Sequence, residues 1–141
     1  MEVLNVQISI VAIVLAVIAN MVLGMSWYSK MLFGNIWMKL VKKKESELVM
    51  KNTDMILAVV VALLTAIGLN SILQFSAELT GLALIPNLLA CAGMLTLTII
   101  APFGLNEVIW EGRDKKLFLL NLAHHFVGYI LMGGIISYFV F

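Results

Sequence analysis

Two adjacent histidines, His124 and His125, are the side chains of this sequence that could serve the widest range of chemistry. They lie in the otherwise almost wholly apolar run "KKLFLLNLAHHFVGYILMGG", residues 115–134, where the Asn121 amide is placed to bond either ring. Neighbouring residues of a helix point about 100° apart, so both rings cannot face one small site. Three roles stay open: an interhelical hydrogen bond or surface anchor, a proton or solute pathway, and metal binding. No spacing such as His-x3-His or Cys-x2-Cys supports a metal.

A pair of carboxylates follows a different apolar run. Glu107 and Glu111 are four residues apart and would share a helix face, with Arg113 and Lys115 close enough to pair with them. A surface ion-pair cluster explains this pattern, although paired carboxylates can also transfer protons or hold a metal. The sequence supplies no nucleophile, phosphate-binding loop or substrate-cleft signature to accompany them. We therefore expect no catalytic residues, no metal site, no cofactor and no enzyme activity.

Composition decides which solvent surrounds these groups. The chain has 141 residues, of which 62% are hydrophobic and 12% charged, whereas soluble domains are about half apolar and a quarter charged. This imbalance indicates lipid as the solvent. The net charge of +1 says little about partners, and we expect membrane lipid but no nucleic acid among them. The single cysteine, Cys91, lies in an apolar run and is interpreted as a packing residue.

Four apolar runs are long enough to cross a bilayer. They cover about residues 3–26, 55–75, 82–103 and 117–139. A helix of about 20 residues spans the hydrocarbon core. Backbone groups in lipid must bond internally, and these continuous runs do not alternate as barrel strands do. The sequence therefore predicts an all-α fold, a four-helix bundle forming a single integral membrane domain over residues 1–141.

Charged residues are confined to the connections between the runs. All nine Lys and Arg residues fall in the first and third connections, while the second connection carries only Glu78 and the carboxyl-terminal end carries no charge. By the positive-inside rule, the first and third connections are cytoplasmic and both termini lie outside. We expect a multi-pass protein of the cell membrane in this orientation. Residues 27–54 form an interfacial and cytoplasmic segment, because aromatic rings alternate with lysines there.

Polar residues inside the runs fall at two depths. An inner layer, within about two turns of the cytoplasmic ends, is predicted to comprise Asn20, Asn121, His124 and His125. An outer pair in the opposite half comprises Asn70 and Asn87. Unpaired polar groups are costly at these depths, so each is a candidate for a hydrogen bond between helices or for a solute pathway.

Small side chains recur every four residues along two of the runs. They are Ala12, Ala16, Asn20 and Gly24 in the first run and Ala58, Ala62, Ala66 and Asn70 in the second. Such stripes let membrane helices approach closely. Gly133 and Ser137 have the same spacing in the last run, and this motif does not tell an internal contact from an oligomer interface.

Two blocks of sequence resemble a known family. "GMSWYSKMLFGNIWMK", residues 24–39, and "NEVIWEGRDKKLFLLNLAHHFVGYILMG", residues 106–133, are similar to the signature blocks of the small four-span membrane proteins catalogued as domain of unknown function seventeen sixty-one. The matching positions are Trp27, Tyr28, Ser29, Leu32, Phe33, Gly34, Trp37 and Met38, then Glu111, Gly112, Arg113, Leu117, Phe118, Asn121, Gly128, Met132 and Gly133. The resemblance implies the fold and topology, and it brings no established activity.

Both blocks lie at the cytoplasmic ends of the runs, where they are expected to form one cluster. Its members are Trp27, Tyr28, Trp37, Glu107, Trp110, Glu111 and Arg113. We expect a non-catalytic structural or accessory membrane module that forms homo-oligomers or joins a larger membrane complex. The alternative is a small channel or transporter that uses the inner polar layer, and a membrane enzyme is a third hypothesis.

Overall fold

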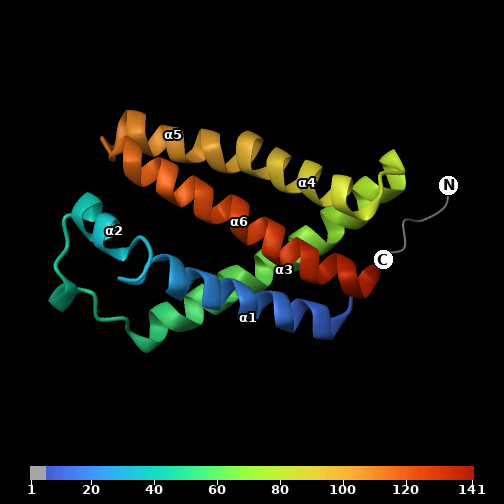
Figure 1. Cartoon of the computed structure of the whole chain (residues 1–141), viewed down its shortest axis with the longest axis horizontal. Helices are drawn as coiled ribbons and strands as arrows, with labels where there is room; N and C mark the ends of the chain where they lie inside the picture. The colour runs from blue at the N-terminus through green and yellow to red at the C-terminus, as the bar shows by residue number, and fades with distance from the viewer. Residues whose placement is uncertain (1–5) are drawn as a thin grey trace.

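The protein is built from helices joined by short turns, as a computed structural model that describes residues 6–141 shows (Figure 1). The elements are α1 (Ile10–Trp27), α2 (Gly34–Val41), the 3₁₀ turn η1 (Glu45–Glu47), α3 (Asn52–Thr80), α4 (Leu84–Leu95), the π-helical turn η2 (Thr96–Ile100), α5 (Ala101–Trp110) and α6 (Lys115–Val140). Four helices are long and apolar enough to cross a membrane: α1, α3, the continuous helix over residues 84–110, and α6. The prediction of an all-α, four-span membrane protein is confirmed.

Helix α6 is the element that the other spans share. It packs against α1, α3, α4 and α5, and its amino-terminal half also contacts α2. Figure 1 shows α6 running beside the α4 and α5 helix while α3 crosses the bundle obliquely. The position of α6 therefore determines how the remaining helices meet.

The central residues of the small-residue stripes are buried inside this single chain, whereas Asn20, Gly24 and Ala58 are only partly buried. Ala12 and Ala16 of α1 and Ala62 and Ala66 of α3 are each at most 1% exposed. They adjoin a core whose members are Ile13, Ala16, Ala66, Leu69, Leu73, Leu88, Cys91, Met132 and Ile136. These stripes therefore serve contacts within one chain, and association with further copies or with a larger complex stays a prediction.

The first helix begins at Ile10, later than the apolar run that predicts it. Ser9 caps it, its Oγ accepting from the Ala12 N–H at 3.3 Å. Just before it, the Gln7 N–H donates to Gln74 Oε1 at 2.8 Å, and the Gln7 carbonyl accepts from Gln74 Nε2 at 2.7 Å and from Asn70 Nδ2 at 3.0 Å. Side-chain amides of α3 thus satisfy a stretch of non-helical backbone near the membrane. Residues 3–5 of the predicted span lie outside the described residues.

The third span contains a wide turn that the hydropathy pattern does not reveal. Residues 96–100 form a π-helical turn immediately before Pro102. Proline has no N–H to donate and its ring clashes with the carbonyl four residues earlier, so a wider turn accommodates it. The Thr96 and Thr98 hydroxyls each donate to the carbonyl four residues earlier, at 2.7 Å.

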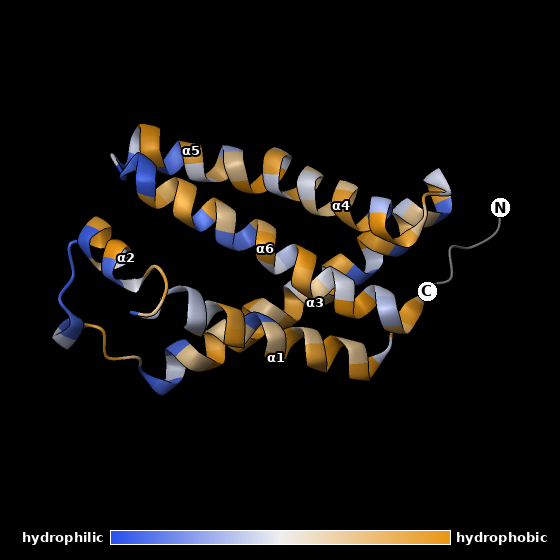
Figure 2. Ribbon diagram, viewed as in Figure 1, coloured by the Kyte–Doolittle hydropathy of each residue, from blue (hydrophilic) through white to orange (hydrophobic). Residues whose placement is uncertain are grey.

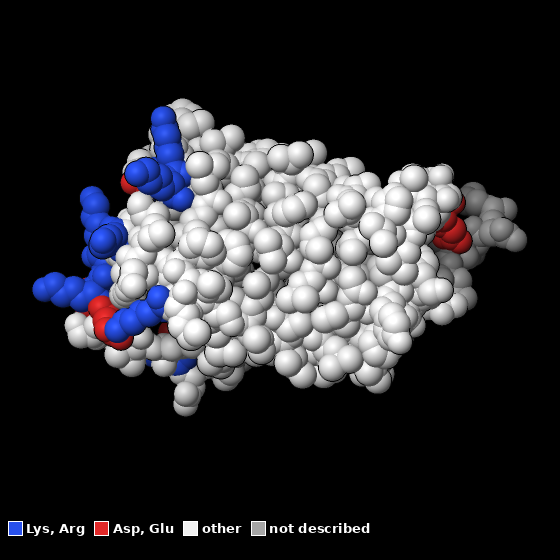
Figure 3. All heavy atoms as spheres, viewed as in Figure 1, with Lys and Arg blue, Asp and Glu red and all other residues white. Residues whose placement is uncertain are grey.

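Charge and hydropathy divide the molecule into an apolar body and one charged end. Figure 2 shows hydrophobic residues along the four long helices, and Figure 3 shows Lys and Arg gathered at the end that carries α2. We call this the charged end. Helices α3 and α5 extend past the ends of the predicted apolar runs, and α6 begins two residues before its run, at Lys115. The added turns carry polar residues suited to the headgroup layer.

Gly133 provides a test of this packing. A Cβ there would lie 2.5 Å from Leu88 Cδ1 and 3.4 Å from Leu73 Cδ1, whereas a Cβ at Gly68 would meet nothing within 4 Å. Gly133→Leu overpacks the contact of α6 with α3 and α4, and it should lower the free energy of unfolding by about 2 kcal/mol. Gly68→Leu, the matched control, should change it by less than about 0.5 kcal/mol. Unfolding in mixed micelles measures both, and equal losses would contradict this packing.

Candidate functional site

The chain turns sharply after α1, and this turn brings α2 back to the bundle. The Phe33 N–H donates to the Trp27 carbonyl at 3.0 Å, and the Gly34 N–H donates to the Ser29 carbonyl at 2.8 Å. A Cβ at position 34 would collide with the backbone carbonyls of Tyr28 and Ser29, so the turn closes only around glycine. Helix α2 consequently begins at Gly34 and packs against α6.

Aromatic rings fill the corner between α1, α2 and α6. The Trp27 and Phe33 ring centroids are 4.7 Å apart, and those of Tyr28 and Trp37 are 5.5 Å apart. The His124 ring of α6 lies 5.6 Å from Trp27 and 5.2 Å from Tyr28. His124 is therefore surrounded by the aromatic residues of the first sequence block.

Tyr28 also makes the one side-chain hydrogen bond that the described residues show between this corner and α6. Its hydroxyl donates to Asn121 Oδ1 at 2.9 Å, so the Asn121 carbonyl oxygen serves Tyr28 instead of a histidine ring. Burial raises the pKa of the Tyr28 phenol above its ordinary value. The phenol is thereby kept in the protonated form that can donate.

A cavity of about 580 Å³ opens beside this corner, and we call it the inner cavity. Its deeper wall contains Asn20 and Gly24 of α1, Tyr28, Trp37 and His124. The connection between α2 and α3 lines its other side with Lys43 and Glu47, and the first turn of α3 adds Asp54. Two members of the predicted inner layer, Asn20 and His124, thus meet at one cavity from two different spans.

The other two members of that layer lie in a separate recess. Asn121 and His125 line a cleft of about 230 Å³ between α5 and α6, together with Glu107 and Arg113. The His124 and His125 ring centroids are 5.7 Å apart with ring planes at 70°. Helix α6 therefore divides the four predicted polar-layer residues between two recesses. The hydrogen bond from Tyr28, which lines one recess, to Asn121, which lines the other, connects them.

The carboxylates of the second sequence block are engaged in ion pairs. Arg113 Nη1 lies 3.0 Å from Glu107 Oε2, and Arg113 Nε lies 3.0 Å from Glu111 Oε2. Trp110 is 82% exposed and does not join them. Residues 6–141 contain no group of three or more His, Cys, Asp and Glu side chains placed to hold a metal.

The predicted cytoplasmic-face cluster is accordingly split into two groups. Trp27, Tyr28 and Trp37 belong to the aromatic corner, whereas the ion-paired carboxylates lie beyond α6 at the end of α5. Both groups lie toward the charged end, with α6 between them.

The predicted outer pair has a structural part in the bundle. Asn70 and Asn87 are 1% and 2% exposed. Asn70 Nδ2 donates to the Gln7 carbonyl, and Asn87 Nδ2 donates to the Leu73 carbonyl at 2.8 Å. Each amide therefore supports backbone, and the two do not bond to each other.

Glu47 and Asp54 are residues of the cavity that sequence reasoning missed. Glu47 Oε2 accepts from the Lys44 N–H at 2.7 Å, and Asp54 Oδ2 accepts from the Lys51 N–H at 3.1 Å. These two caps shape the connection that covers the cavity. The sequence signals them by two Lys-x-x-acid spacings, in the segment predicted to be interfacial and cytoplasmic, residues 27–54.

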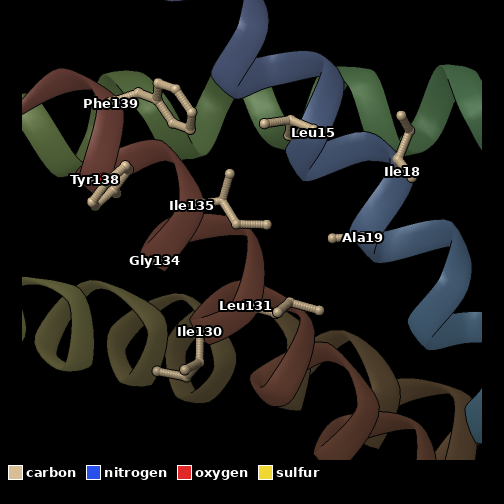
Figure 4. Close-up of a pocket in the computed structure, with 9 residues that line it drawn as sticks. All are labelled: Leu15, Ile18, Ala19, Ile130, Leu131, Gly134, Ile135, Tyr138 and Phe139. Carbon is tan, nitrogen blue, oxygen red and sulfur yellow. The ribbon is translucent and has the colours of Figure 1, made fainter.

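A larger recess elsewhere is apolar. A groove of about 710 Å³ lies between α1 and the carboxyl-terminal half of α6, where Leu15, Ile18, Leu131 and Ile135 point toward it (Figure 4). None of its lining residues is charged. Tyr138 is its one lining residue with a polar side chain, so the inner cavity, with several, is the better candidate site.

Comparison with known proteins gives one match. The model of the family described as "Protein of unknown function (DUF1761)" matches residues 11–137. The chain therefore belongs to this family, and the resemblance of the two sequence blocks is confirmed. No curated protein and no solved structure matches it.

Tyr28→Phe tests the bond that organises the site. It leaves Asn121 Oδ1 without its donor, so we expect a loss of about 1 kcal/mol in the free energy of unfolding. Tyr138→Phe is the control, because Tyr138 is 81% exposed and makes no side-chain hydrogen bond within residues 6–141. Unfolding in mixed micelles compares the two, and equal stability of both variants would contradict the assigned role.

The same bond predicts a pH dependence. Because burial raises the Tyr28 pKa in the folded state, its contribution should be complete below the unfolded-state pKa of about 10. It should disappear as the pH rises through the raised folded-state pKa. The stability difference between the parent protein and Tyr28→Phe, measured from pH 7 to pH 11, should therefore shrink only at the alkaline end. A loss near neutral pH would contradict this reasoning.

Proposed function

We propose that this member of the DUF1761 family is a non-catalytic membrane module that binds a small solute in the inner cavity. The observation that carries the proposal is the meeting of Asn20 and His124, from two different spans, at a cavity of about 580 Å³. Cavities of about 300 to 1,000 Å³ are the usual size for small-molecule sites. Charged side chains at its mouth and polar ones deeper within suit a solute that enters from water.

Unsatisfied polar groups at this cavity support the proposal. His124, which lines the cavity, has a buried Nε2 without a hydrogen-bond partner among the described residues. Asn20 is half-buried, and its side chain makes no hydrogen bond to any residue within 6–141. Such groups are costly at membrane depth. A bound solute or water would provide the missing partner of the Asn20 amide, which lines the cavity.

The packing of the rest of the bundle bears on the alternative of a channel or transporter. One turn beyond Asn20, Ala16 is fully buried, and Met132 and Ile136 of α6 are at most 1% exposed. This packed core separates the inner cavity from the opposite end of the bundle. Transport through one chain would therefore require α1 and α6 to move apart. Transport is the second candidate because two of the four polar-layer residues, Asn20 and His124, line the cavity.

Orientation follows from charge in this proposal. The end that carries α2 also carries the Lys and Arg residues of both basic connections. By the positive-inside rule we place the charged end, and with it the cavity mouth, on the cytoplasmic side of the cell membrane. The cavity then samples solutes of the cytoplasm or headgroups of the inner leaflet.

Cysteine accessibility tests the proposal. In a Cys91→Ala background, Asn20→Cys should react with a membrane-impermeant methanethiosulfonate in inside-out vesicles and stay unreactive in right-side-out vesicles. Ala16→Cys, one turn farther into the core, should react in neither. The reason is that Asn20 lines the cavity whereas Ala16 is fully buried.

The outcomes separate the hypotheses. Failure of Asn20→Cys to react from either side would overturn the solute-binding proposal. Reaction of both cysteine variants from both sides would instead show a continuous pore and favour the channel. Mass spectrometry of the intact protein measures the labelled fraction directly.

A further inference from the structure

We propose that the inner cavity selects cationic ligands, specifically an ammonium group carried on an apolar body. This inference rests on the solute-binding function proposed above, because it names the ligand class of the same cavity. Three features of the lining carry it: uncompensated carboxylates, aromatic faces and an apolar floor.

The carboxylates supply negative charge at the mouth. Glu47 and Asp54 line the cavity, and each uses one oxygen to cap a backbone N–H while the other oxygen makes no hydrogen bond to the described residues. Neither forms an ion pair within residues 6–141, whereas the neighbouring Glu45 pairs with Lys30 at 2.6 Å. Lys43 is the one basic residue among the lining residues. The lining therefore has a net charge of minus one.

The remaining basic groups of this end do not belong to the cavity. Figure 3 shows Lys and Arg side chains projecting outward from the charged end. Long basic side chains keep their charged groups in water, where salt screens them over about 10 Å. The potential inside the recess consequently depends most on the charges that line it.

Aromatic faces supply the second feature. The Tyr28 and Trp37 rings, 5.5 Å apart with planes at 59°, both line the cavity. Their π faces attract cations, and Trp attracts them most strongly. The Tyr28 hydroxyl is occupied by Asn121, so Tyr28 contributes its ring to the cavity and not a hydrogen-bond donor.

An apolar floor supplies the third feature and excludes a small inorganic cation. Met21, Met25, Leu48, Val49 and Met50 also line the cavity. Metal ions such as Mg²⁺ and Ca²⁺ require several oxygen ligands; the apolar floor offers none, and the described residues contain no group of three or more His, Cys, Asp and Glu placed to hold a metal. Methionine side chains adapt to varied apolar shapes. An organic ammonium ion, either a free solute or a choline or ethanolamine headgroup, matches the charge, aromatic and apolar parts together.

Calorimetric titration in uncharged maltoside micelles tests charge selection with three probes of similar size: phenyltrimethylammonium, benzyl alcohol and benzenesulfonate. We expect the cation to bind about tenfold more tightly than the neutral or anionic probe. Equal or tighter binding of benzenesulfonate would overturn the inference, since it would assign the site to Lys43. Binding of benzyl alcohol as tightly as the cation would overturn it as well.

Matched variants test which groups are responsible. Glu47→Gln and Asp54→Asn keep an oxygen that accepts the capping bond, and each should weaken phenyltrimethylammonium about threefold. Glu45→Gln, which removes a carboxylate outside the cavity, should leave the affinity for phenyltrimethylammonium unchanged. Lys43→Met should raise this affinity about twofold, and Trp37→Leu should lower it about fivefold. Unchanged affinity in Glu47→Gln, Asp54→Asn and Trp37→Leu, each with a parental melting temperature, would overturn the inference.

Added lipid distinguishes the two sources of ammonium. Competition by phosphatidylcholine but not by phosphatidylglycerol would assign the site to a headgroup, and absence of competition would assign it to a free solute; both support ammonium recognition. If Asn20→Cys is labelled but the cation is not preferred, only this inference fails. If Asn20→Cys is unreactive from either side, the proposed function fails too.

Discussion

The hydrogen bond from the Tyr28 hydroxyl to Asn121 Oδ1 is the interaction on which the charged end depends. It joins residues 93 positions apart, at the end of the first span and inside the last. Near lipid, neither group can be left unpaired without cost, and burial keeps the phenol protonated. With the end of α1 held there, the turn that closes around Gly34 directs α2 onto α6. The aromatic corner and the inner cavity both follow from that geometry.

The two ends of the bundle are consequently built for different purposes. Toward the opposite end, small residues and Gly133 let α1, α3, α4 and α6 approach closely, and amides of Gln74 and Asn70 satisfy the backbone before α1. Toward the charged end, α1 and α6 are separated by aromatic rings and a recess. A closely packed half beside an open recess supports the proposed binding module.

Much of the fold could be predicted because lipid imposes simple rules on a sequence. Continuous apolar runs predict the four spans, and helical geometry predicts that His124 and His125 point in different directions. Hydropathy could not place the start of α1, because Gln7 is bonded by Gln74 from a distant part of the chain. Hydropathy also does not predict the π-helical turn before Pro102, because this turn arises from the missing backbone N–H of proline and not from a polar side chain. The four polar-layer residues fall into two recesses because different helices flank α6 on its two sides, and the sequence does not reveal which helices these are. Glu47 and Asp54 line the cavity because the turn at Gly34 brings α2 back to the bundle.

The most direct test of the central claim is an electron-microscopy structure of the full chain in a lipid nanodisc. The account predicts Tyr28 within hydrogen-bonding distance of Asn121, and His124 facing a solvent- or ligand-filled cavity closed by the connection between α2 and α3. His124 packed against lipid or against a second copy, with that connection away from α1, would contradict it.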